Sequence, residues 1–105
     1  MEYVRLGRTG LKVSRICLGT NMFGPGYVDD QRAIAVVNEA RECGVNFIDT
    51  ADAYNAGQSE HVVGKAVKGR RHDFVIGTKG FVPTGAGVND RGLSRKHLIT
   101  AVESS

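Results

Sequence analysis

The sequence predicts an α/β fold built from repeated βα units. Three short apolar runs have the composition of buried strands: residues 16–18, 45–48 and 74–76. Three residues that follow these runs, Gly19, Asp49 and Lys79, are separated by intervals of about 30 residues, which is the length of one βα unit. This period is typical of a parallel barrel or a doubly wound sheet, and it indicates that the strand ends share one edge.

The elements before the second strand follow from turn and capping signals. Residues 3–14 are predicted to form a β-hairpin, because two short β-prone runs flank a turn at residues 7–10 that contains two glycines. A helix is expected to begin after Asp29 or Asp30, whose carboxylate can cap the first amides, and to end at Gly44. One face of this helix is apolar and would lie on the sheet: Ala33, Ile34, Val37 and Ala40.

Two further helices are predicted. Ser59 is expected to cap the second helix, which would end at Gly69. Its apolar residues repeat at helical spacing: Val62, Val63, Ala66 and Val67. Gly64 within it costs about 1 kcal/mol relative to alanine, which predicts that this position approaches the sheet closely. Ser94 is expected to start the third helix, with three apolar residues: Leu98, Ile99 and Val102.

The residues just beyond the predicted strands include an acid, a phenol and an amine. The loops that follow parallel strands gather on one rim of a barrel, so Asp49, Tyr54 and Lys79 are predicted to converge. An ammonium group near a phenol stabilises the phenolate, which makes a tyrosine beside a lysine a possible proton donor near neutral pH. Taken singly, the three residues would more often be a capping carboxylate, a packing aromatic and a solvated cation. Their order and spacing together favour a functional role.

Several segments in one order resemble the aldo-keto reductases. They are residues 3–14, 17–20, 44–54, 57–60, 63–66 and 78–79. The resemblance implies a (β/α)8 TIM barrel, of which residues 1–105 would form one partial domain with a leading β-hairpin and about three βα units. The hairpin sequence is most similar to the bacterial, plant and potassium-channel β-subunit branch of the family.

The resemblance assigns roles to the matching residues. Tyr54 is similar to the family's general acid, and Lys79 and Asp49 to the pair that tunes it. Gly19, Thr20 and Asp49 match positions near the nicotinamide ribose of NADP(H). The implied reaction is the NADP(H)-dependent reduction of an aldehyde or ketone to an alcohol by hydride transfer.

Two long loops are expected to border a substrate opening in this family, at residues 21–27 and 80–93. Long loops without regular structure tend to be binding segments or disordered. Met22, Phe23 and Phe81 are therefore candidate substrate-binding residues. The alternative is that these side chains are satellite hydrophobes packed under a loop.

The length of the chain conflicts with a complete barrel, which typically needs about 250 residues. We expect a truncated barrel, because the family's fourth tetrad residue, a histidine, and its clamp for the 2′-phosphate would lie beyond Ser105. The 105-residue chain alone is therefore expected to be inactive and to self-associate. Two alternatives to a reductase stay open: a regulatory or binding module of the same fold, and an inactive self-associating fragment.

The composition favours an ordinary cytoplasmic α/β protein, with 41% hydrophobic and 24% charged residues. No apolar run reaches the ~18 residues of a membrane span, and residues 1–3 do not open a signal peptide. The net charge of +3 does not by itself indicate nucleic-acid binding, because the chain has neither an aromatic platform nor a nucleic-acid-binding motif. No GxGxxG follows the first strand, which disfavours a Rossmann-type dinucleotide site.

The cysteines, the histidines and Asp52 are expected to have structural rather than catalytic or metal-binding roles. Cys17 and Cys43 lack CxxC spacing and are expected to be buried reduced thiols. The histidines have no spacing that suits a metal, so no metal site is expected, and His61 and His97 are placed on helix surfaces. Asp52 is expected to bond loop amides.

Overall fold

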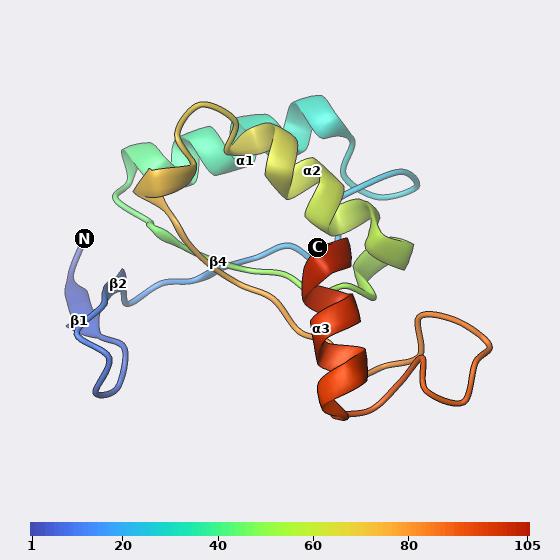
Figure 1. Ribbon diagram of the computed structural model, residues 1–105. Helices are drawn as coiled ribbons and strands as arrows, with labels where there is room; N and C mark the ends of the chain where they lie inside the picture. The colour runs from blue at the N-terminus through green and yellow to red at the C-terminus, as the bar shows by residue number, and fades with distance from the viewer.

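Three parallel strands form the central sheet of the structure, a computed structural model that describes residues 1–105. Strand β4 (Phe47–Asp49) lies between β3 (Leu18–Gly19) and β5 (Val75–Gly77). A separate antiparallel hairpin consists of β1 (Tyr3–Arg5) and β2 (Lys12–Ser14) and lies beyond one end of the sheet (Figure 1). The parallel pairing confirms the α/β class expected from the sequence.

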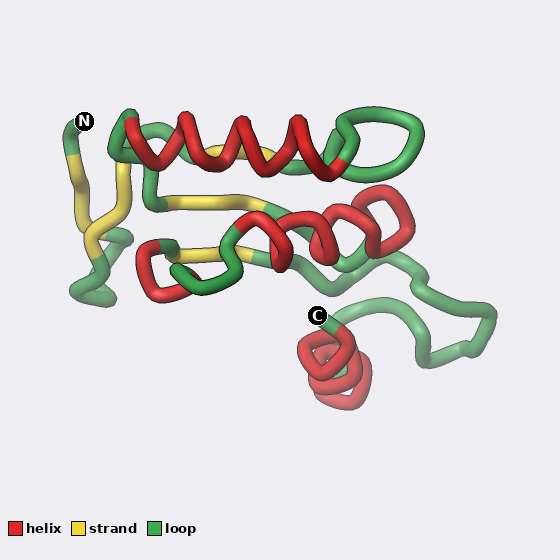
Figure 2. The backbone as a smooth tube through the Cα atoms, turned by 90° about the horizontal axis from the view of Figure 1, so that it is seen from above, coloured by secondary structure: helices red, strands yellow, loops and turns green.

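Helices α1 (Asp30–Glu42) and α2 (Gln58–Ala66) cover one face of this sheet and run alongside the strands (Figures 1 and 2). Helix α3 (Arg95–Ser104) follows a long exposed loop and crosses the direction of the other two. Two short 3-10 turns, η1 (Tyr54–Gly57) and η2 (Arg71–Asp73), flank α2 in the chain. None of the helices combines the length and the hydrophobicity needed to cross a membrane.

The strand register separates the two faces of the sheet. Leu18 and Ile76 pair with Ile48, which is fully buried beneath the helices. Because side chains alternate along a strand, Phe47 and Asp49 point to the opposite face from Ile48. The core lies between the sheet and the helices and contains nine buried residues: Phe23, Ala33, Val37, Ile48, Val62, Val63, Ala66, Val67 and Phe74.

Helix α1 follows the sequence prediction at both ends. Asp29 is its N-cap, and the carboxylate accepts a hydrogen bond from the Arg32 amide at 2.9 Å. The chain leaves the helix at Gly44, whose φ of 87° is a left-handed conformation that glycine adopts without a steric penalty. Ala33 and Val37 are fully buried, so the predicted apolar face does lie on the core.

The prediction that Ser59 caps α2 is wrong. The helix begins one residue earlier, at Gln58, and its N-cap is Gly57 with a φ of 87°. Ser59 lies inside the first turn, where its side chain is fully buried. The explanation offered for Gly64 is also wrong, because a Cβ added there would meet no atom within 4 Å. Gly64 is exposed.

Helix α3 begins where expected but buries a different face. Ser94 caps it by accepting a hydrogen bond from the His97 amide at 3.1 Å. His97 and Ala101 are buried, so the prediction of a surface His97 is wrong. Ala101 packs against Gly80, where an added Cβ would lie 2.9 Å from the alanine Cβ. Three apolar residues are left exposed: Leu98, Ile99 and Val102.

Both cysteines are free thiols, but they are exposed rather than buried. Cys43 is the C-cap of α1, and Cys17 precedes β3. Ile16 is exposed, whereas Ile48 is fully buried because it points toward the helices.

Candidate active site

The carboxyl ends of β4 and β5 carry the polar group that the sequence predicts. Asp49 is the last residue of β4 and pairs with Gly77, the last residue of β5. Lys79 follows two residues later, and Tyr54 begins the short turn η1. Backbone hydrogen bonds continue beyond both strands, from the Thr50 amide to the Gly77 carbonyl at 2.8 Å and from the Asp52 amide to the Lys79 carbonyl at 3.1 Å. These bonds hold the two strand ends side by side.

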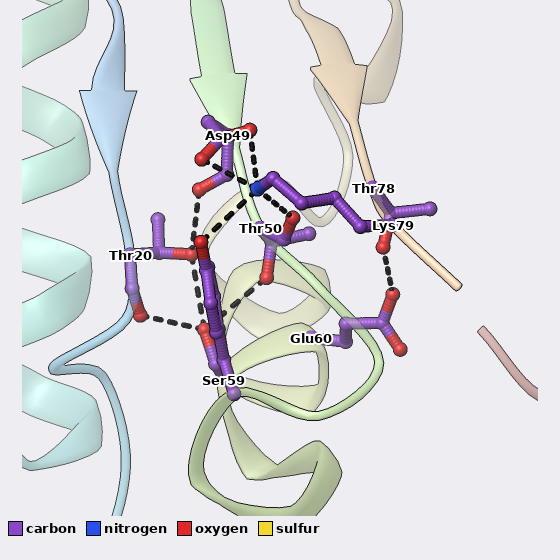
Figure 3. Close-up of polar contacts among 8 residues, drawn as sticks. Thr20, Asp49, Thr50, Ser59, Glu60, Thr78 and Lys79 are labelled. Carbon is purple, nitrogen blue, oxygen red and sulfur yellow. Dashed lines mark hydrogen bonds and ion pairs between the residues drawn. The ribbon is translucent and has the colours of Figure 1, made fainter. Parts of the chain in front are cut away.

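Lys79 lies at the centre of this group. Its Nζ donates to both carboxylate oxygens of Asp49 at 2.7 Å and to the Thr50 carbonyl at 2.9 Å (Figure 3). It also lies 3.1 Å from the Tyr54 hydroxyl oxygen and 4.7 Å from the centre of the tyrosine ring. The predicted proximity of Asp49, Tyr54 and Lys79 is therefore confirmed. Their chemical roles stay a prediction.

The ion pair is open to solvent on one side. The side chains of Lys79 and Asp49 are 50% and 40% exposed. Solvent screens a pair of this kind, so its contribution to folding stability is small.

The surroundings of Lys79 favour its charged form. Partial burial is the largest single influence and lowers the pKa of Lys79, but the contacts with Asp49 and Tyr54 together outweigh it. The pKa of Lys79 is therefore raised above its ordinary value of 10.5. Because folding raises it, the ammonium stabilises the folded chain at all pH values below 10.5. This contribution disappears as the pH rises through the folded-state pKa.

Asp49→Asn should lower the pKa of Lys79, because the amide removes the negative charge that holds the ammonium at 2.7 Å. The titration of the Lys79 side chain can be followed by NMR after carbon-13 labelling of lysine. Asp30→Asn is a matched control, since Asp30 pairs with Lys65 on the helices. A Lys79 titration that is the same in Asp49→Asn and in the parent would contradict this electrostatic account.

A thiol lies near the same charges. The pKa of Cys17 is raised, first by desolvation and then by the charge of Asp49, while Lys79 opposes the shift. The exposed thiol of Cys17 is therefore protonated at neutral pH.

Of the residues predicted to contact a cofactor, Gly19 and Asp49 are accessible and Thr20 is not. Gly19 is exposed, and a Cβ added there would meet no atom within 4 Å. It pairs with Asp49 in the sheet, so open space lies beside the carboxylate on the face without helices. Thr20 is fully buried, and its hydroxyl donates to the Asp49 carbonyl at 3.0 Å. The structure contradicts the assignment of Thr20 to cofactor contact.

The three predicted substrate-binding residues differ in their exposure to solvent. Phe23 is 4% exposed and belongs to the core under α1 and α2, so its prediction as a substrate wall is wrong. Its amide donates a hydrogen bond to the Thr20 carbonyl at 3.0 Å. Met22 and Phe81 are 49% and 60% exposed. These two residues remain available to a ligand.

Asp52 does not bond loop amides as expected. Both of its carboxylate oxygens are buried without a hydrogen-bond partner. One of them would lie 3.6 Å from a Cβ added at Gly80, near the start of the long loop.

Three features of the site have no counterpart in the sequence predictions. Asn55 and Ala56, directly after Tyr54, have left-handed φ values of 48° and 51°. Such a conformation is rare for non-glycine residues and is held here by neighbouring contacts. The Asn55 side chain donates to the Phe23 and Pro25 carbonyls. The other two features are the buried hydroxyl of Ser59 and the contact between Glu60 and Thr78. From the sequence alone, a serine near the start of a helix is read as a cap, so the buried position of Ser59 could not be predicted.

Comparisons with known proteins give one consistent result. A family model described as the aldo/keto reductase family matches residues 15–105. A protein of Oryza sativa subsp. japonica, named a probable voltage-gated potassium channel subunit beta, is 40% identical over 108 residues, covering 100% of this chain and 33% of the rice protein. An uncharacterized oxidoreductase of Bacillus subtilis is 46% identical over 113 residues, covering 93% of this chain and 34% of its own length.

Solved structures are similar over the same extent. The holo form of an aldo-keto reductase from Bacillus halodurans has a TM-score of 0.83 at 34% identity. The match covers 99% of this chain and 35% of the Bacillus halodurans chain. The chain thus spans about a third of the length of the curated relatives it matches.

Proposed function

Because this chain belongs to the aldo/keto reductase family, we propose that the whole protein reduces aldehydes or ketones to alcohols with NADP(H), using Tyr54 as the general acid. The observation that carries the proposal is the contact of one ammonium group, on Lys79, with the Tyr54 hydroxyl and both oxygens of Asp49. Aldo-keto reductases are oxidoreductases, and a phenol beside a cation suits the protonation of a carbonyl oxygen.

The side chains have distinct tasks in this proposal. Tyr54 gives its phenolic proton to the substrate oxygen as negative charge develops there. The Lys79 ammonium, 3.1 Å from the phenol oxygen, stabilises the phenolate that remains. Asp49 binds the ammonium through both carboxylate oxygens and so fixes its direction.

The residues on the uncovered face of the sheet fit a nicotinamide cofactor. NADP(H) supplies the hydride for the carbonyl carbon. Gly19 has no side chain and leaves open space at the end of β3, which allows a ribose to approach the backbone. Asp49, 40% exposed, can accept hydrogen bonds from ribose hydroxyl groups on the same face. Met22 and Phe81, both exposed, are proposed to contact the substrate.

The proposed architecture places this chain within an eight-stranded barrel. The hairpin β1–β2 and the three parallel strands with their helices would correspond to the first part of that barrel. The similarity to solved aldo-keto reductases over nearly the whole chain supports this assignment. The open face of the sheet, which carries Asp49, would then line the barrel interior.

A reductase assay tests the proposed function. The whole protein, mixed with NADPH and a panel of aldehydes and ketones, should consume NADPH and form the alcohols in equal amounts. Absence of turnover with every carbonyl, while NADPH still binds, would contradict the reductase assignment.

A second candidate is a regulatory module of the same fold. The similar rice protein carries the name of a probable potassium channel β subunit, which favours a partner protein. The polar group around Lys79 is compatible with both functions, so turnover distinguishes them. A protein that binds NADPH tightly but reduces no carbonyl would support the regulatory module.

The 105-residue chain alone is expected to self-associate and to show no NADPH-dependent reduction. Ile16 is 61% exposed, and Phe47 and Val75 on the uncovered face are only half-buried. Parallel sheets are normally covered on both faces, so this surface favours contact with another chain. Sedimentation and a reductase assay of the 105-residue polypeptide test the expectation together. A compact monomer with reductase activity would contradict it.

A further inference from the structure

Ser59 occupies an unusual position for a helical serine. It lies in the first turn of α2 with no exposed surface, whereas serine in a helix more often faces solvent or bonds its own helix. Its hydroxyl donates to the Thr20 carbonyl at 2.6 Å and lies 3.2 Å from Thr50 Oγ1 (Figure 3). A serine hydroxyl has one proton, so Ser59 Oγ accepts the proton of Thr50. Ser59 therefore joins the residues that follow β3 and β4.

The next residue of α2 reaches the third strand. Glu60 accepts a hydrogen bond from the Thr78 hydroxyl, just beyond β5 (Figure 3). Two adjacent residues of one helical turn thus contact the ends of all three parallel strands. We call this group of five residues the strand-end clamp: Ser59, Glu60, Thr20, Thr50 and Thr78.

The clamp bonds to the backbone that carries the candidate active site. The Thr20 amide and hydroxyl both donate to the Asp49 carbonyl, at 3.1 and 3.0 Å. The carbonyl of Thr50 accepts the Lys79 ammonium at 2.9 Å. Thr78 directly precedes Lys79 in the chain. Every threonine of the clamp is therefore bonded to, or adjacent to, Asp49 or Lys79.

The Lys79 side chain is held by Asp49, Thr50 and Tyr54, so its position depends on where the ends of β4 and β5 lie. It has a flexible four-carbon stem and is 50% exposed, so ordering it costs rotamer entropy. An exposed ion pair does little to offset this cost. A misplacement of about 1 Å in a catalytic group can lower a rate by about 100-fold. The relative placement of the β4 and β5 ends thus decides where the ammonium lies.

We propose that the strand-end clamp positions Asp49 and Lys79 beside Tyr54, with Ser59 as its central positioning residue. This inference rests on the proposed reductase function but adds a role for α2, which supplies no group that touches the substrate. The helix would fix the three strand ends while the reaction takes place on the face of the sheet without helices.

The test compares Ser59→Ala with Ser104→Ala in the whole protein. Ser104 also lies in a helix, but it is exposed and its hydroxyl bonds only to the Thr100 carbonyl of the same helix. Two quantities are measured in each variant: steady-state kcat and KM for a carbonyl substrate, and the Lys79 titration by NMR. Near-UV circular dichroism checks that each variant is folded.

Ser59→Ala should lower kcat by about tenfold or more while the carbonyl KM stays within about twofold, because positioning affects the chemical step rather than binding. The pKa of Lys79 should fall toward its ordinary value, since the ammonium loses its fixed neighbours. Ser104→Ala should match the parent in both quantities.

The inference is overturned if either kcat or the Lys79 titration of folded Ser59→Ala matches the parent. If Ser59→Ala does not fold, Thr78→Val is judged by the same criteria, because valine keeps the shape of threonine and removes only its bond to Glu60. The Lys79 titration can be measured even in a protein without reductase activity. An inactive parent would therefore contradict the reductase proposal, and the Lys79 titration would still decide whether the clamp acts.

Discussion

Tyr54→Phe should reduce the rate of carbonyl reduction by the whole protein by about 100-fold or more, within the range attributed to general acid catalysis. The change removes one hydroxyl group and keeps the ring that lies under the Lys79 ammonium. Binding of NADPH should be retained, because Gly19 and Asp49 are unchanged. The loss should therefore be found in kcat and kcat/KM together, as expected when an interaction of the transition state is deleted.

The measurement combines steady-state kinetics with NADPH fluorescence to follow binding. Tyr3→Phe is a matched control, because Tyr3 loses an equivalent hydroxyl, bonded to the Gly44 carbonyl in the exposed hairpin. Undiminished turnover in Tyr54→Phe would exclude Tyr54 as the proton donor. A loss of NADPH binding would instead indicate that the phenol helps to hold the cofactor.

Lys79→Met should have an effect of similar size, about 100-fold in kcat, which is typical when one electrostatic contact to a developing charge is removed. Methionine keeps the unbranched stem and deletes the ammonium 3.1 Å from the phenol oxygen. The pH profile should change as well, because the charge that favours the phenolate is absent.

The profiles of parent and variant are compared over the same pH range, with Lys96→Met as the control. Lys96 is exposed on α3 and has no ion pair in the structure. If the profile of Lys79→Met overlays that of the parent, Lys79 has no part in tuning the acid.

Features with a regular period could be predicted from the sequence. The interval of about 30 residues between strand ends reflects the fixed geometry of a βα unit, and the structure confirms the three parallel strands. The capping signals of Asp29 and Ser94 are local and were predicted correctly. The same local signal was misleading at Ser59. Gly57 is the N-cap there, and Ser59 bonds to Thr20, which lies 39 residues earlier, just beyond β3.

Burial was harder to predict, because it depends on contacts between distant segments. Phe23 belongs to a glycine-containing loop and was predicted to face a substrate, but it fills the core beneath two helices. His97 is buried and Cys17 exposed, both against the habits expected of them. In each case the neighbouring element, rather than the residue type, determines the outcome.

Only part of the candidate site could be predicted from the sequence. Asp49, Tyr54 and Lys79 could be found because the chain order places them at the ends of adjacent strands. The strand-end clamp could not be found, since its hydroxyl groups meet only after α2 has packed on the sheet. Thr20 illustrates the difference: the sequence placed it correctly at a strand end, but its side chain turns toward Ser59 instead of a cofactor.

Hydride transfer from the cofactor to the carbonyl carbon is the central claim, and an isotope experiment tests it most directly. The whole protein is given an aldehyde and NADPH that carries deuterium at the transferable nicotinamide position, and the alcohol is analysed by mass spectrometry and NMR. The account predicts one deuterium on the former carbonyl carbon of every alcohol molecule and none on the hydroxyl oxygen after exchange with water. An alcohol without deuterium, or no alcohol at all, would contradict it.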